Sequence, residues 1–149
     1  MVATAALLVW ALAVAVRDQR SRRIDNWLLL LPLVVELGWW WSSARGLLGH
    51  GFTESALGML VAGAVFLPGY LLKSSGGGDV KLAAVCGWLV GFHAALVMML
   101  VAAGSLGLLS AVTYFRRART ADRSTRLPAG PSIAIGFAVT LLLLTLDRS

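Results

Sequence analysis

Long apolar segments, separated by short polar stretches, follow one another along the whole chain. Six of them can be counted, at about 2–16, 27–41, 54–72, 79–91, 92–115 and 132–146. A helix needs about 20 apolar residues to cross a bilayer core, and fewer where its ends snorkel or the bilayer thins. The pattern therefore predicts an all-α fold, a polytopic membrane helix bundle of about six transmembrane helices in one domain over residues 1–149.

The fourth and fifth segments follow each other without a polar stretch between them. Joined, they would form a run of about 37 residues, which is too long for one ordinary span. We therefore place a break at Gly91.

The composition agrees with a membrane bundle. Hydrophobic residues make up 58% of the chain and charged residues only 13%, whereas a soluble domain is nearer half apolar and a quarter charged. The excess of apolar side chains is expected to face lipid. The formal charge of +6 lies mostly in short loops between apolar segments, so we expect membrane lipid rather than nucleic acid as a partner.

The distribution of basic residues predicts an orientation. Alternating six spans puts the loops at 17–26, 73–81 and 116–130 on one side, and these contain all 13 basic residues except Arg45 and Arg148. Short loops rich in lysine and arginine stay in the cytoplasm. The prediction is a multi-pass protein of the cytoplasmic membrane with both termini outside.

Two of the seven acidic residues, Asp18 and Asp79, fall where an apolar segment meets a cytoplasmic loop. The topology puts them on the same side and at similar depth, and ionisable groups near a membrane interior are costly and often functional. The glycines at 76–78 allow a close backbone approach and positive φ, and Asp79 then begins the fourth span, where the helix dipole favours a carboxylate. Two close carboxylates would share a proton, so that one activates water while the other polarises a carbonyl.

Each aspartate also has a simpler interpretation. Asp18 can form a weak loop ion pair with Arg17 or Arg22, and Asp79 can cap the fourth helix. Lys81 can steady the charge on Asp79 or bind lipid headgroups, although a lysine that merely snorkels to the interface is the simpler interpretation.

Three segments resemble the type IV prepilin peptidases. Residues 76–82, Gly-Gly-Gly-Asp-Val-Lys-Leu, are similar to the Gly-x-Gly-Asp signature of that family with its Val-Lys-Leu continuation. Asp18, followed by Arg-Arg-Ile at 22–24 and by Asn26, resembles the first catalytic segment. Residues 127–136 resemble the late segment that opens the last span.

The resemblance implies a membrane aspartic endopeptidase with Asp18 and Asp79 as its catalytic pair and its active site facing the cytoplasm. Its substrate would be a prepilin or pseudopilin precursor, cut between a basic leader and a hydrophobic helix. Gly76, Gly78, Lys81 and Asn26 would shape the site, with no cofactor and no metal. The chain lacks the cysteine-rich insert of the larger members, so it resembles the short form of tight-adherence (Flp) pilus systems, and no methyltransferase activity is expected.

The chain departs from the family pattern at two positions. Asp25 stands in place of the usual proline, and Ala129 in place of the usual tyrosine. Either change could alter substrate preference or activity. Elsewhere, Gly58, Gly63, Gly87 and Gly91 are expected to let helices approach closely, either for a pilin helix or within the bundle.

Other functions fit the sequence less well. A non-catalytic membrane subunit of a pilus or secretion assembly is the main alternative. A small transporter with an aspartate proton relay would be expected to show an internal repeat, and none is seen. A serine protease would need His93 and Ser105 to meet, but they are twelve residues apart on one helix. The zinc motif His-Glu-x-x-His is absent from the sequence.

Overall fold

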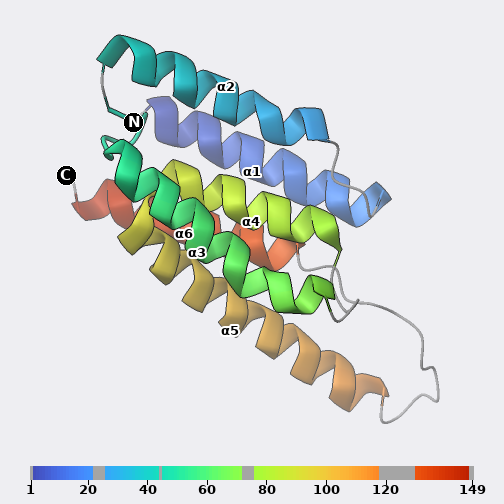
Figure 1. Cartoon of the computed structure of the whole chain (residues 1–149). Helices are drawn as coiled ribbons and strands as arrows, with labels where there is room; N and C mark the ends of the chain where they lie inside the picture. The colour runs from blue at the N-terminus through green and yellow to red at the C-terminus, as the bar shows by residue number, and fades with distance from the viewer. Residues whose placement is uncertain (1, 22–25, 44, 72–75, 118–129, 148–149) are drawn as a thin grey trace.

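The computed structural model describes residues 2–21, 26–43, 45–71, 76–117 and 130–147 (Figure 1). Within these ranges the chain forms six α-helices and no strand, which confirms the all-α prediction. The helices are α1 (Val2–Ser21), α2 (Asn26–Ser43), α3 (Phe52–Leu71), α4 (Gly77–Val90), α5 (Phe92–Arg117) and α6 (Gly130–Asp147).

Several helices extend beyond the apolar segments that predicted them. The clearest case is α1, which continues to Ser21 although its apolar run ends at residue 16. Arginine and glutamine favour helical backbone, so the polar residues at 17–20 prolong the helix while breaking the hydropathy pattern. This extension keeps Asp18 on a helix rather than in a loop.

The break between α4 and α5 lies at Gly91, as predicted. Gly91 has φ 78° and ψ 173°, and its N–H donates to the carbonyl oxygen of Gly87 at 3.0 Å. L-amino acids with a side chain rarely adopt this positive φ. Gly91 therefore ends α4 and lets α5 start in a new direction.

Glycines bring neighbouring helices into backbone contact. A Cβ atom built on Gly58 of α3 would overlap the carbonyl oxygen of Gly87 in α4, and one built on Gly87 would overlap that of Gly58. On α6, a Cβ on Gly136 would lie 2.6 Å from the carbonyl oxygen of Met98 in α5. The predicted close approach is thus confirmed at Gly58 and Gly87, whereas Gly63 makes only an ordinary contact, 3.5 Å from Ala84.

The other helices complete a bundle around this centre. α3 packs most extensively on α4, α5 packs on α6 and α3, α1 packs mainly on α6, and α2 lies against α4. Figure 1 shows both termini at the end of the bundle that also holds the α2–α3 connection. The opposite end gathers the last turns of α1 and α3 with the first turns of α2, α4 and α6.

The outer surface of the bundle is largely apolar. Large hydrophobic side chains of α2 point outward, among them Trp27, Leu30, Val34 and Trp41, and Leu100 of α5 does the same. Among the described residues, the window 92–109 of α5 is long and apolar enough to cross a membrane, with a mean hydropathy of 2.0, and 52–68 and 131–146 form shorter apolar helices.

Candidate active site

Asp79 is the third residue of α4 and is buried. Gly76, in an extended conformation (φ −80°, ψ 148°), precedes the helix, and its N–H donates to Oδ2 of Asp79 at 3.2 Å. In return, the N–H of Asp79 donates to the carbonyl oxygen of Gly76 at 3.1 Å. The carboxylate is therefore fixed against the start of the helix, where the dipole favours negative charge.

Of the two properties expected of the glycines before Asp79, positive φ and close approach, the structure shows only the close approach. None of the glycines at 76–78 has a positive φ; among the described glycines only Gly49 and Gly91 do. At Gly77 the small residue is needed because the ring of Tyr70 in α3 packs closely against the backbone: a Cβ there would lie 3.2 Å from that ring.

Asp18 lies in the last turn of α1 with only 5% of its surface exposed. Its Oδ2 atom is buried and has no hydrogen-bond partner among the residues that the structure describes. Asp18 and Asp79 are close enough to interact electrostatically. The structure thus brings together, at one end of the bundle, two buried carboxyl groups that are 61 positions apart in the chain.

Lys81 and Asn26 also meet at this end. Nζ of Lys81 donates to Oδ1 of Asn26 at 3.1 Å, linking α4 to the first residue of α2. Both side chains are exposed. The segments 22–25 and 118–129, which include Asp25 and Ala129, lie outside the described residues.

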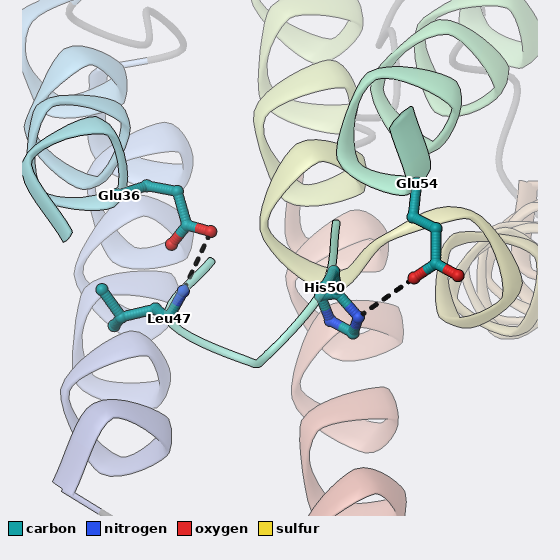
Figure 2. A network of polar contacts seen from close by, with 4 residues as sticks. All are labelled: Glu36, Leu47, His50 and Glu54. Atoms are coloured by element: carbon teal, nitrogen blue, oxygen red, sulfur yellow. Dashed lines mark hydrogen bonds and ion pairs between the residues drawn. The ribbon is translucent and has the colours of Figure 1, made fainter. Parts of the chain in front are cut away.

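A second polar group lies at the opposite end of the bundle and was not singled out by the sequence motifs. Figure 2 shows Glu36 of α2, fully buried, accepting a hydrogen bond at 3.1 Å from the backbone N–H of Leu47. Nearby, Nδ1 of His50 lies 3.7 Å from Glu54. The only sequence signal was a lone acidic residue inside an apolar segment.

Alternative chemistries find no support in the described residues. His93 is exposed, and the hydroxyl of Ser105 donates to the carbonyl oxygen of Ala102 within its own helix. No group of three His, Cys, Asp or Glu side chains in these ranges could hold a metal ion.

Comparison with known proteins shows to which family this chain belongs. The model of the type IV leader peptidase family matches residues 5–112. The chain belongs to the type IV leader peptidase family. Searches of curated proteins and of solved structures found no match.

The match places both aspartates within the family region. It includes Asp18, Asn26, Asp79 and Lys81, and it ends before the segment 127–136. Family membership identifies the protein as a protease of the leader-peptidase type, while the late resemblance at 127–136 stays a prediction.

Proposed function

We propose that this leader peptidase is an aspartic endopeptidase in which Asp18 and Asp79 are the catalytic pair. The observation that carries the proposal is that two buried carboxyl groups from different helices lie within electrostatic reach of each other in the family region. Buried carboxyl groups that interact are costly to maintain for structure alone. Their cost is understandable if they share a proton for catalysis.

The surroundings suggest different roles for the two groups. Asp79 accepts a backbone hydrogen bond at a helix N-terminus, which suits the ionised general base. Asp18 sits at a helix C-terminus, and its Oδ2 has no hydrogen-bond partner within the described ranges, which suits the protonated partner that donates to the substrate carbonyl.

In this mechanism Asp79 takes a proton from water, and the water oxygen attacks the scissile carbonyl carbon while Asp18 protonates the carbonyl oxygen. The tetrahedral intermediate then collapses. The C–N bond breaks, the leaving nitrogen takes a proton from Asp79, and Asp18 recovers its own proton from the former carbonyl oxygen.

The proposed substrate is a prepilin or pseudopilin precursor with a basic leader, a glycine and a hydrophobic helix. The proposed location is the cytoplasmic membrane, with several spans, the aspartates at the cytoplasmic face and both termini outside. The apolar outer surface of the bundle and the basic residues that flank Asp18 and Asp79 in the sequence support this placement.

The test is co-expression with a candidate precursor, with leader removal followed by gel shift. Wild type, Asp18→Asn, Asp79→Asn and the control Glu54→Gln are compared at matched membrane levels. Glu54 is an exposed carboxylate at the far end of the bundle, so its removal should leave cleavage intact. Loss of cleavage in both aspartate variants supports the mechanism, and undiminished cleavage in either one refutes it. A wild type that cleaves no cognate precursor would favour the non-catalytic subunit.

A further inference from the structure

Two side-chain hydrogen bonds tie the beginning of α2 to two different helices. Nε1 of Trp10 in α1 donates to the carbonyl oxygen of Leu28 at 2.8 Å. Nζ of Lys81 in α4 donates to Oδ1 of Asn26 at 3.1 Å. Asn26 and Leu28 both belong to the first turn of α2, so one helical turn contacts both α1 and α4.

Pro32 explains why the carbonyl of Leu28 is available. In a regular helix this oxygen would accept the N–H four residues later, at position 32. Proline has no N–H, so the acceptor inside α2 stays open. The indole of Trp10 takes the place of the missing donor.

Both tethered helices carry an aspartate of the proposed site. Asp79 lies two residues before Lys81, and Asp18 lies eight residues after Trp10, about 12 Å along α1. α1 packs mainly on α6, and α2 lies against α4. The first turn of α2 therefore links α1, which carries Asp18, to α4, which carries Asp79.

We propose that this turn is a positioning clamp that holds Asp18 at its working distance from Asp79, with Asn26 and Lys81 as its α4 side and Trp10 with Leu28 as its α1 side. The inference rests on the proposed function, since it assigns a role around the same two carboxyl groups. Lys81 then acts through Asn26 and does not contact the reacting atoms.

The kinetic test compares Lys81→Met and Asn26→Leu with wild type. Misplacing one carboxyl group should lower kcat by about ten- to a hundredfold, while KM for the precursor should stay within about twofold. Asn26→Asp keeps an acceptor for Lys81 and should retain activity. Arg45→Met, which removes an exposed positive charge at the opposite end, is the matched control.

A geometric test does not depend on activity. In an Asp18→Cys/Asp79→Cys protein, bifunctional thiol reagents of graded length report the distance between the two positions. The clamp predicts efficient cross-linking by short reagents, and a several-fold lower yield with these reagents after Lys81→Met. Cys86 is buried, and the protein without the added cysteines checks that it does not react.

The outcomes separate the two proposals. Unchanged cross-linking in Lys81→Met would overturn the clamp, even if kcat fell, because Lys81 would then act directly on Asp79 or on the substrate. Failure of Asn26→Asp to retain activity would also count against it. If the cross-linking shift occurs but Asp18→Asn and Asp79→Asn remain active, the clamp stands as geometry and the aspartic mechanism fails.

Discussion

Some backbone N–H and C=O groups in this protein lack a backbone hydrogen-bond partner, and a side chain from another part of the chain supplies one. Pro32 removes the donor for Leu28, and Trp10 supplies another. At the opposite end, the Glu36 carboxylate accepts from the N–H of Leu47, and a Cβ on Gly46 would overlap its Oε1 atom. Backbone groups away from water need partners, so each of these side chains stabilises the helix connection that it reaches.

Removing the indole donor should destabilise the fold, because the Leu28 carbonyl loses its partner. We expect Trp10→Phe to lower the free energy of unfolding by about 1 kcal/mol. The cost should shrink in a Pro32→Ala background, because alanine restores the N–H that the Leu28 carbonyl lacks. Thermal unfolding of the four proteins of this cycle in detergent measures the difference. An equal cost in both backgrounds would show that the bond between Trp10 and Leu28 does not depend on Pro32.

Pairs of helices are held together where small residues permit backbone contact. The crossing of α3 and α4 is built on Gly58 and Gly87, and that of α5 and α6 on Gly136. Between helices in lipid, close packing replaces the hydrophobic effect as the main attraction. α4 is the most enclosed helix of the bundle, since nearly all of its residues from Leu82 to Val90 are buried, and it is also the helix that presents Asp79.

A methyl group at the α3–α4 crossing should force the two helices apart. Gly87→Ala is expected to destabilise the protein by about 1–3 kcal/mol through overpacking. Gly104→Ala in α5 is the matched control, because a Cβ there meets nothing within 4 Å, and it should be neutral or stabilise by about 0.4–1 kcal/mol. Thermal unfolding of both variants and of the wild type in detergent measures the two effects. Equal effects of the two substitutions would contradict the backbone contact.

The sequence predicted some features of this fold and not others. The number of helices and the break at Gly91 followed from segment lengths, because a membrane limits how long a span can be. The end of α1 did not, because hydropathy reports apolar runs and not helical backbone. The meeting of Lys81 with Asn26 could not be derived either, because it depends on how helices far apart in the chain rotate against each other.

The site shows the same division. The sequence predicted that Asp18 and Asp79 lie on the same side of a membrane, and the structure puts both buried carboxyl groups at one end of the bundle, within electrostatic reach of each other. The expected positive φ of the glycines before Asp79 was wrong, because Gly76 caps the helix in an extended conformation and Gly77 serves packing against Tyr70.

At the scale of the whole molecule, the two ends of the bundle differ in their charged residues, and the outer surface between them is largely apolar. Asp18 and Asp79 stand in stretches of the sequence, 17–26 and 73–81, that are rich in basic residues, while Glu36, His50 and Glu54 lie at the other end of the bundle. The positive-inside rule therefore predicts that the aspartates face the cytoplasm.

Cysteine labelling tests this orientation. Ser43→Cys, at the exposed end of α2, should react with a membrane-impermeant maleimide in intact spheroplasts. Thr125→Cys, in the arginine-rich loop, should react only after permeabilisation. The natural Cys86 is buried and should add little background. The reverse labelling pattern would contradict the predicted topology.

The paired-aspartate mechanism is the centre of the account, and initial rates with purified protein in lipid nanodiscs test it most directly. A precursor with a basic leader is incubated with wild type, Asp18→Asn or Asp79→Asn, and mass spectrometry locates the cut. We predict that wild type cuts after the glycine that precedes the hydrophobic helix, and that each variant, folded and at equal concentration, loses at least about a thousandfold in rate. Cleavage at a near-normal rate by either folded variant would contradict the mechanism.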